Sequence, residues 1–239
     1  NYNEKRWANA KSKDGSYWVW IPRYAYKIET CYHMSGEDCL SETGIEAGEI
    51  DVKFLKNRTN KTIDETIIET EGYEPGVRDT SLHYFLHPTF DFDDGQLGFW
   101  MAKFEVSAHE GLLSGTTGGS CNSLDNDSTK SPLVAPNKTS WRCINISNAF
   151  KATLAMKDNT IYGWLPEEID THMLTNQEWG AVAYLSKSKY GAHNLEVWNN
   201  SFRGFQTGCA GPSVSAHSQD SCEGYEYNIE DGVKASTTH

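Results

Sequence analysis

The sequence of 239 residues predicts a single α+β domain, residues 1–239, built from short strands, two main helices and long loops tied by disulfides. Three observations predict this class. Residues 173–191 carry the start and stop signals of a helix, and residues 143–159 have the composition of a second one. Short aromatic and β-branched runs predict strands. Six cysteines lie in loops rich in Gly, Ser, Asp and Asn, which predicts disulfide ties.

The segment 173–191, MLTNQEWGAVAYLSKSKYG, predicts a sharply bounded helix. Thr175 and Glu178 have the spacing of a capping box, in which each side chain accepts from the other residue's amide. Leu174 and Trp179 occupy the positions of a hydrophobic staple across that cap. Apolar residues at helical spacing predict one buried face, formed by Trp179, Val182, Ala183 and Leu185. We therefore expect a core helix with Thr175, Glu178 and Trp179 in structural roles.

The second helix is expected within residues 143–159, CINISNAFKATLAMKDN. Ser147 or Asn148 can cap its start, since short polar side chains accept from the first free amides of a helix. Phe150 and Leu154 are four residues apart and predict its apolar face.

Three segments predict strands. Residues 16–29, SYWVWIPRYAYKIE, alternate aromatic and β-branched side chains, and Pro22 demotes the run to an edge strand or marks a bulge. Residues 50–57 predict a second strand. Residues 83–107 predict two strands joined as a hairpin, because the Asp-Gly pair at 94–95 lies between apolar runs. The rest divides into a lead-in at 1–15 and an irregular, loop-rich tail at 192–239.

The charge balance excludes two classes of partner. The chain has 21 basic and 33 acidic residues, a formal net charge of −12, and no cluster of Lys and Arg. Nucleic acids and anionic membrane surfaces attract positive patches, so neither is an expected partner. No apolar run approaches the roughly 20 residues that span a bilayer, so this chain is not expected to insert into a membrane.

The cysteines indicate disulfides. None of them forms a C-x-x-C pair, which argues against structural zinc. Short loops favour pairing Cys31 with Cys39, Cys121 with Cys143, and Cys209 with Cys222, although six cysteines allow fifteen connectivities. Disulfides persist outside the reducing cytosol, so we expect an extracellular protein, either secreted or on a cell or virion surface.

Metal and acid–base candidates are weak. His83 and His87 are four residues apart, but HYFLHP predicts a strand approach with no third ligand. The acids of 91–95 and 125–129 alternate oxygen donors without completing a calcium loop, so no cofactor is expected and calcium is left as the open alternative. The acids of 167–170 are expected at the surface, where nothing shifts a pKa toward acid–base catalysis.

The tail combines rigid aromatic side chains with adaptable polar ones, as binding surfaces do. The alternative is that its larger rings fill the core beneath the loops. The candidate ligand-binding residues are Trp198, Asn199, Asn200, Phe202, Arg203, Tyr225 and Tyr227.

Two segments resemble a known family. FWMAKFEVS at 99–107 and MLTNQEWGAVA at 173–183 are similar to motifs of the formylglycine-generating-enzyme, or sulfatase-modifying-factor, family, with Thr175, Glu178 and Trp179 at matching positions. WIPRYAYKI also resembles its opening strand. The resemblance implies a C-type-lectin-like fold, which displays loops on a small scaffold. In style the chain is nearest to prophage tail proteins and to bacterial surface or pilin-associated proteins, some of them diversified by retroelements.

The departures from that family shape the functional expectation. The family's late segment, with its copper-binding cysteines, has no counterpart, so the fold is expected to be truncated, cleaved or completed by a partner, and no catalytic residue can be assigned. We expect a non-enzymatic binding or display module on a phage tail or bacterial surface, used in receptor binding or adhesion, with a host glycan or protein as partner. The alternatives are a structural subunit that self-assembles into a pilus filament or tail, and a copper-dependent oxidase of the formylglycine-generating type.

Overall fold

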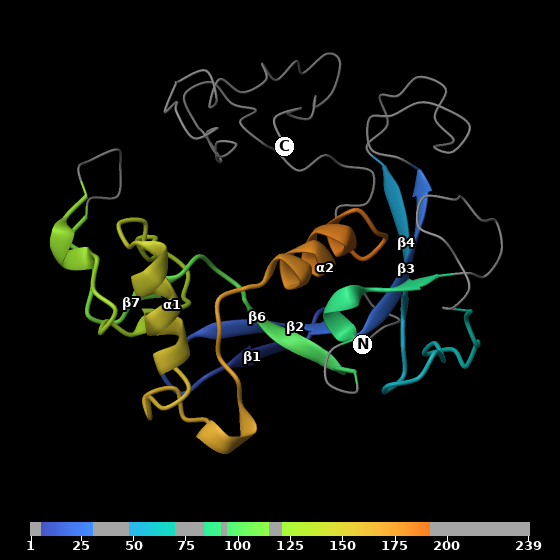
Figure 1. The fold of residues 1–239 in the computed structure, drawn as a ribbon, viewed down its shortest axis with the longest axis horizontal. Coiled ribbons are helices and arrows are strands. Elements are labelled where there is room, and N and C mark those ends of the chain that lie inside the picture. Colours follow the sequence, from blue (N-terminus) through green and yellow to red (C-terminus); the bar gives the residue numbers. More distant parts are fainter. Residues whose placement is uncertain (1–5, 31–47, 70–83, 92–94, 115–120, 192–239) are drawn as a thin grey trace, which may run out of the picture. The chain divides into compact units, whose positions relative to one another are not determined.

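The computed structural model describes residues 6–30, 48–69, 84–91, 95–114 and 121–191. These residues form a mixed α/β structure with antiparallel strand pairs and two helices (Figure 1), in agreement with the predicted α+β class.

The chain divides into two compact units. Unit 1 comprises residues 1–24, 54–67 and 86–182, and unit 2 comprises residues 25–53, 68–85 and 183–239. The expectation of one domain over residues 1–239 remains a prediction. No helix among the described residues is both long enough and apolar enough to cross a bilayer.

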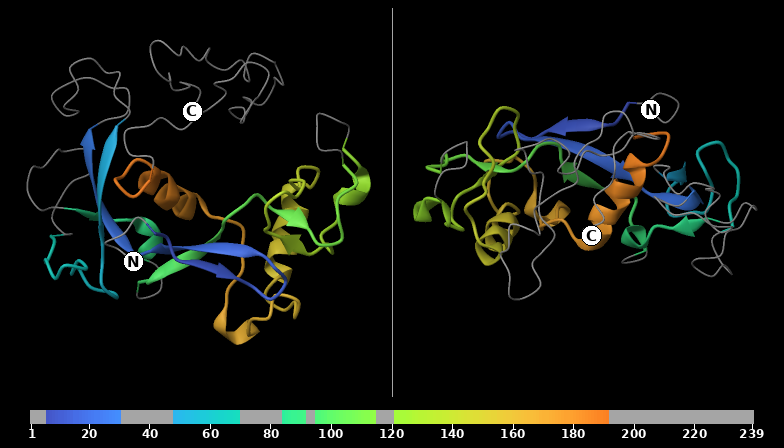
Figure 2. Two further views of the ribbon diagram at one scale, coloured as in Figure 1. Left: turned by 180° about the vertical axis from the view of Figure 1, so that it is seen from behind. Right: turned by 90° about the horizontal axis from the view of Figure 1, so that it is seen from above.

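Unit 1 contains a three-stranded sheet in the order β1-β2-β6. Its strands are β1 (Asn9–Lys11), β2 (Tyr17–Pro22) and β6 (Gly98–Ala102), and both pairs are antiparallel. Figure 2 shows the three strands side by side. The run SYWVWIPRYAYKIE does break at its proline, but β2 is the middle strand, so the predicted edge position is wrong. Pro22 fits there because it is the last residue of β2, beyond the end of the pairing with β1.

Gly98 allows β6 to approach β2 closely. Its φ is +149°, and a Cβ atom there would lie 2.3 Å from the Ile21 carbonyl oxygen and 2.5 Å from the Trp20 ring. The Trp20 ring can therefore lie across the start of β6 and contact the Trp100 ring, with 5.3 Å between the ring centroids. Glycine is required at this position by both backbone conformation and space.

Among its described residues, unit 1 also contains five short elements outside this sheet. They are η2 (Pro88–Phe90), β7 (Ser107–Ala108), η3 (Ser123–Asp125), β8 (Pro132–Leu133) and η4 (Pro166–Glu168). β7 and β8 pair with each other in an antiparallel ribbon.

Unit 2 contains most of a second three-stranded sheet in the order β4-β3-β5. Its strands are β3 (Tyr24–Thr30), β4 (Glu49–Phe54) and β5 (Phe85–Leu86), so the strand expected at 50–57 is confirmed. The hairpin expected at 83–107 is wrong, because β5 belongs to this sheet whereas β6 pairs with β2.

The second predicted helix is α1 (Ile146–Ala155). Its cap is Asn145 and neither Ser147 nor Asn148, since the Asn145 side chain accepts a 2.8 Å bond from the Asn148 amide. Asparagine is as good a cap as serine, so the choice is decided by where the extended chain ends.

The capped helix is α2 (Asn176–Ser186). The predicted capping box is confirmed, because the Thr175 amide donates to the Glu178 carboxylate at 2.8 Å and the Glu178 amide donates to the Thr175 hydroxyl at 3.2 Å. A second bond from the Thr175 hydroxyl to the same carboxylate is 2.9 Å long.

The expected core position of Trp179 is wrong. Trp179 is 62% exposed, and the buried stripe of α2 is formed by Glu178, Ala181 and Leu185. The capping box turns Glu178 inward, and the next residue lies about 100° further round the helix, so Trp179 faces outward.

The core of unit 1 fixes the first half of α2. Tyr24 is fully buried and donates a 2.7 Å hydrogen bond to the Ala181 carbonyl oxygen. Its ring contacts those of Phe90 and His87, at centroid distances of 5.3 and 5.5 Å. The small residue Gly180 passes 3.6 Å from the His87 ring, measured from where a Cβ atom would stand.

Candidate functional site

The seven ligand-binding residues expected in the tail, from Trp198 to Tyr227, lie outside the described residues, as do Cys31, Cys39, Cys209 and Cys222. The remaining expected disulfide is confirmed, since Cys121 and Cys143 are bonded with their Cα atoms 5.4 Å apart. The site expected in the tail therefore stays a prediction, and the candidate site described below is a separate one.

Unit 1 contains a pocket of about 620 Å³. One wall is the sheet face that carries Ala10, Trp18, Trp100 and Ala102, which the strand register places on the same side. The other walls come from α1 and from the segment 169–174 that leads into α2. Four tryptophans supply most of its aromatic surface, namely Trp18, Trp100, Trp141 and Trp164.

Three of these tryptophans direct their indole N–H groups into the protein. Trp18 donates to the Ser12 hydroxyl at 2.9 Å, Trp141 to the Asp125 carbonyl oxygen at 2.7 Å, and Trp164 to the Met156 carbonyl oxygen at 3.1 Å. Since the polar atom of each ring is already bonded, the rings offer mainly carbon surface to a ligand.

Trp100 differs from the other three. It is 47% exposed, and its indole N–H makes no hydrogen bond within the described part of the chain. Trp100 is therefore the pocket tryptophan that can offer a ligand both a ring face and a hydrogen-bond donor.

Three aromatic rings in contact, Trp18, Trp164 and Tyr162, hold part of the pocket wall in place. Trp164 stacks on Tyr162 with a centroid distance of 4.6 Å and a 10° interplanar angle, and Trp18 lies 6.1 Å from Trp164. Tyr162 is buried and donates a 2.6 Å bond to the Pro132 carbonyl oxygen. Burial, with the nearby charges of Asp14 and Glu110, raises the pKa of Tyr162, so its hydroxyl stays a donor.

A buried carboxylate holds the wall that carries Trp141. Asp125 has no exposed surface and accepts bonds from the amides of Leu113 and Ser114, at 3.0 and 2.7 Å, and from the Ser114 hydroxyl at 2.6 Å. The hydroxyl and amide bonds outweigh burial and lower the pKa of Asp125 to about 2. The disulfide at Cys143 ties the same wall.

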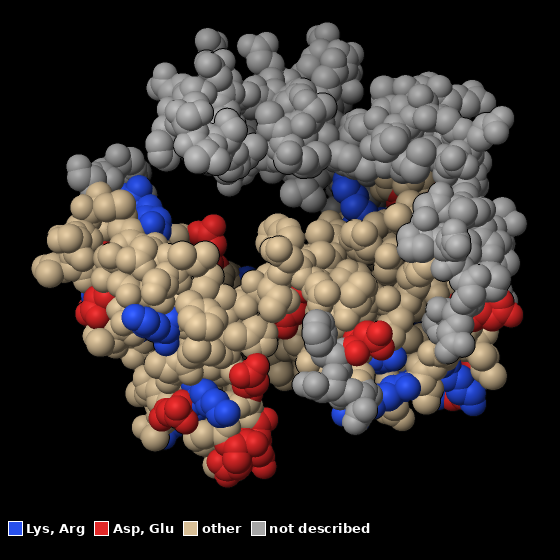
Figure 3. Space-filling view, in the orientation of Figure 1, with Lys and Arg blue, Asp and Glu red and all other residues tan. Residues whose placement is uncertain are grey.

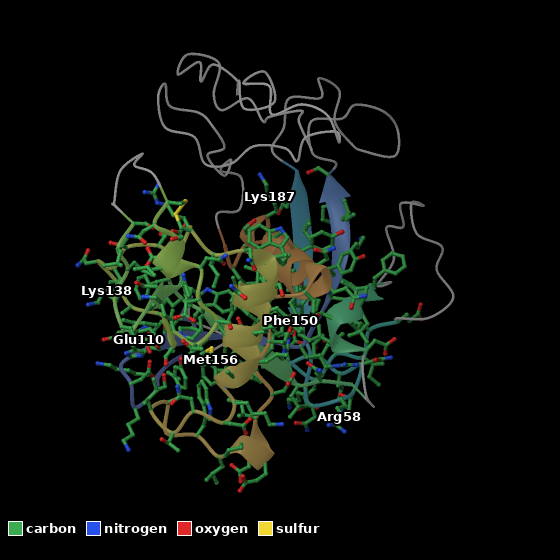
Figure 4. The ribbon with its side chains drawn as sticks, turned by 60° about the vertical axis from the view of Figure 1, so that its left-hand side comes forward. Arg58, Glu110, Lys138, Phe150, Met156 and Lys187 are labelled. Carbon is green, nitrogen blue, oxygen red and sulfur yellow. A yellow bond between two sulfur atoms is a disulfide. The ribbon has the colours of Figure 1, made fainter. Side chains whose placement is uncertain are left out.

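Helix α1 lines the pocket with only part of its apolar surface. Ala152 and Met156 are buried against it, with Ala149 and Thr153 beside them. A second apolar stripe, spaced four residues apart, is exposed and consists of Ile146 (78%), Phe150 (50%) and Leu154 (41%). Figure 4 shows Phe150 on this helix and Met156 at its C-terminal cap. The predicted pairing of Phe150 with Leu154 on one face is confirmed, but that face is not buried.

The polar end of the pocket is built around His172. Its Nδ1 lies 2.8 Å from Asp170 Oδ2, and its Nε2 lies 3.1 Å from Glu178 Oε1. Burial disfavours the charged ring, but the hydrogen bonds and charges of Glu178 and Asp170 outweigh burial and raise the pKa of His172. An imidazolium that donates to both carboxylates fits this geometry.

A second carboxylate–imidazole pair involves Asp14, in the turn between β1 and β2. Asp14 accepts from Ser12 at 2.6 Å and lies 2.9 Å from His109 Nε2, and it also accepts from the buried Ser16. Burial acts to raise the pKa of Asp14, but the bonds from Ser12, Ser16 and His109 lower it. Ser12 in turn accepts from Trp18, so this network positions a pocket ring.

Among the other candidates from the sequence, His83, Asp93 and Asp94 lie outside the described residues. His87 is buried, accepts from the Thr89 amide at 3.4 Å, and has its pKa lowered to about 4 by burial. Asp127 caps the Thr129 amide at 2.9 Å. The acids Glu167, Glu168 and Asp170 are exposed, as expected. In the described ranges no three His, Cys, Asp or Glu residues are grouped so that they could hold a metal ion.

A scan against protein-family models, a search of curated proteins and a search of solved structures found no match to this chain. The site is therefore interpreted from its own geometry.

The tryptophan pocket was missed from the sequence because its tryptophans, at positions 18, 100, 141 and 164, lie in widely separated segments. The alternation of Trp18 and Trp20 in SYWVWIP was a signal that two indoles share one sheet face. Nothing in the sequence places Trp141 or Trp164 beside them.

Proposed function

We propose that this protein is an extracellular, non-enzymatic binding module of C-type-lectin-like fold whose tryptophan-lined pocket holds an apolar segment of a partner protein. The observation that carries the proposal is the chemistry of the pocket in unit 1. Its walls present indole and aliphatic carbon, and three of its four indole N–H groups are already bonded inside the protein. Concave apolar surfaces with a few polar groups at their ends are the usual form of ligand sites.

The pocket favours a protein over a glycan, the two partners that the sequence left open. A sugar ring needs several hydrogen-bonding groups beside the aromatic face on which it stacks. Here the hydroxyls that border the pocket are engaged, Ser12 by Asp14 and Thr171 by the Thr153 carbonyl oxygen at 2.9 Å. An apolar side chain requires no such groups and gains from each carbon that it removes from water.

The confirmed disulfide supports an extracellular location, because such bonds persist in oxidising compartments. The resemblance of FWMAKFEVS and MLTNQEWGAVA to the formylglycine-generating-enzyme family supports the C-type-lectin-like fold, and with it placement on a phage tail or bacterial surface. The α+β class and the capping box at Thr175 are compatible with that family.

The proposal is tested by panning the whole chain against a display library of random dodecapeptides and, in parallel, against a glycan array. We expect enriched apolar peptides whose affinity falls by on the order of tenfold or more in Trp100→Ala. Trp179→Ala is the matched control, since it removes a tryptophan of unit 1 that is also exposed, 62% against 47% for Trp100, and that does not line the pocket. Glycan binding without peptide binding, or equal peptide affinity in Trp100→Ala, would contradict the proposal.

One observation favours a second candidate, a structural subunit that self-assembles. The exposed stripe of α1 is a helix face of the kind that subunit contacts bury. Assembly would be detected as concentration-dependent sedimentation that Phe150→Glu abolishes. A wild-type chain that stays monomeric at high concentration would exclude this candidate.

A further inference from the structure

The outer edge of β6 carries backbone groups with no partner in the described part of the chain. In the order β1-β2-β6, strand β6 is paired on one side only. The Lys103 amide donates to the Tyr17 carbonyl oxygen at 3.1 Å, and the Arg23 amide donates to the Leu97 carbonyl oxygen at 2.9 Å. Opposite residues of an antiparallel pair alternate between hydrogen-bonded and non-hydrogen-bonded positions. These two bonds therefore fix which residues of β6 direct their backbone groups away from β2.

The residues of β6 whose backbone N–H and C=O groups point away from β2 are Gly98, Trp100 and Ala102. They oppose Pro22, Trp20 and Trp18 at the positions where antiparallel strands exchange no hydrogen bonds. No hydrogen bond joins the Trp100 or Ala102 amide to another described residue. An edge with free amides and carbonyls is a template for one more strand.

The tryptophan pocket runs along this same edge. Four consecutive residues of β6, Phe99 to Ala102, line it, although their side chains alternate between the two faces of the sheet. A strand added beside β6 would share its pleat, so every second side chain would project on the face that carries Trp100 and Ala102. Those side chains would enter the apolar pocket.

The charges around the pocket indicate the polar chemistry of the added strand. Acidic side chains gather over η4 in Figure 3, where Glu167 and Glu168 lie, and Asp170 follows them on the wall that lines the pocket. The His172 imidazole is bonded to Asp170, whose side chain remains 76% exposed, and Lys11 is the one Lys or Arg among the described residues that lines the pocket. With a net charge of −12 on the whole chain, this rim complements a basic partner.

We propose that the pocket is occupied by β-strand addition. An extended segment of a partner protein, with alternating apolar side chains and a Lys or Arg, pairs with the outer edge of β6. Its backbone bonds to Trp100 and Ala102, its apolar side chains fill the pocket, and its basic side chain meets the acids of 167–170. This inference rests on the proposed function and adds the binding mode and the chemistry of the partner.

The test removes one backbone donor from the edge. Ala102→Pro deletes a backbone amide of β6 that points away from β2, so no hydrogen bond between the two strands is lost. Proline is tolerated at such a position on an edge strand. We expect the peptides enriched from the dodecapeptide library to lose on the order of tenfold in affinity for this variant. Asn9→Pro is the control, because Asn9 also faces outward, on the opposite edge of the sheet and outside the pocket lining, and its affinity should stay within about twofold.

A second measurement does not depend on the folding of a proline variant. The enriched peptides are resynthesised with single N-methyl groups along the backbone. Strand addition predicts that affinity falls at every second position only, and that replacing the peptide's Lys or Arg weakens binding at low salt. A uniform or absent N-methyl effect, in peptides that Trp100→Ala still weakens, would overturn strand addition and leave the pocket's binding function standing.

Failure at the earlier step has a different signature. If no peptide is enriched, or if enriched peptides ignore Trp100→Ala, the proposed function fails and the strand-addition inference fails with it.

Discussion

At the scale of single residues, Thr175 and Glu178 define where α2 begins. Four hydrogen-bonding atoms of the two residues satisfy one another, and Glu178 is only 8% exposed. A helix start that is closed in this way fixes the direction in which every later side chain points.

We expect Thr175→Ala to lower the free energy of unfolding by about 1 kcal/mol, because the Glu178 amide loses its acceptor. Thr175→Ser keeps the hydroxyl and should retain most of that stability. Urea denaturation of the two variants measures the difference, and equal loss in both would show that the methyl group of Thr175 matters more than its hydroxyl.

Trp179→Ala should change the free energy of unfolding by no more than about 0.5 kcal/mol, since the side chain is 62% exposed. Met156→Ala, at the 5% exposed C-terminal cap of α1, should lower the free energy of unfolding by about 2–5 kcal/mol. Thermal and chemical unfolding of the pair decides whether these exposures hold in solution. A large loss for Trp179→Ala would restore the core role that the sequence suggests.

At the scale of elements, the wall that carries Trp141 depends on a covalent tie. The Cys121–Cys143 bond closes a loop with a sequence separation of 22 residues. Replacing both cysteines with serine should lower the free energy of unfolding by about 3 kcal/mol, through the added freedom of the unfolded chain. Reduction of the Cys121–Cys143 bond in the wild-type protein should lower the free energy of unfolding by the same amount as the double substitution. An unchanged unfolding midpoint in the double variant would contradict the prediction.

The elements also show what the sequence could predict. Local signals sufficed for the two helices, the capping box, the strands at 16–29 and 50–57, and the short-loop disulfide. Strand partners were not predictable, because the Asp-Gly signal at 94–95 describes a turn and cannot exclude that its flanking strands join different sheets.

The face of α2 was mispredicted for a physical reason. Hydrophobicity ranks Trp179 above Glu178 as a core residue, yet Glu178 finds three hydrogen-bonding partners when it turns inward, on Thr175 and His172. The pocket could not be predicted because its tryptophans converge only in three dimensions. The site expected in the tail, at Trp198 to Tyr227, remains a prediction.

At the scale of the whole molecule, three titratable groups with shifted pKa values, His87, Asp125 and His172, contribute to the response to pH. The pKa of His87 is lowered to about 4, so the unfolded chain binds a proton below about pH 6.5 that the folded chain refuses. The pKa of Asp125 is lowered to about 2, so stability falls again as the pH drops from near 3.8 toward 2. The raised pKa of His172 acts in the opposite direction, since its contribution is complete below about pH 6.5 and is lost as the pH rises through the folded value.

These three groups predict a free energy of unfolding that is greatest near pH 6.5 and declines on both sides. Denaturation series across pH measure the profile. His172→Gln should remove the decline on the alkaline side and leave the acid side unchanged. An alkaline decline that persists in that variant would assign it to other groups.

One carboxylate, that of Glu178, both closes the start of α2 and lies within hydrogen-bonding distance of the His172 ring. Substitution of any one of residues 172, 175 and 178 during evolution therefore removes a hydrogen-bonding partner within this group. In an alignment of related chains, substitutions at these three positions should appear together, whereas Trp179 should vary independently of them.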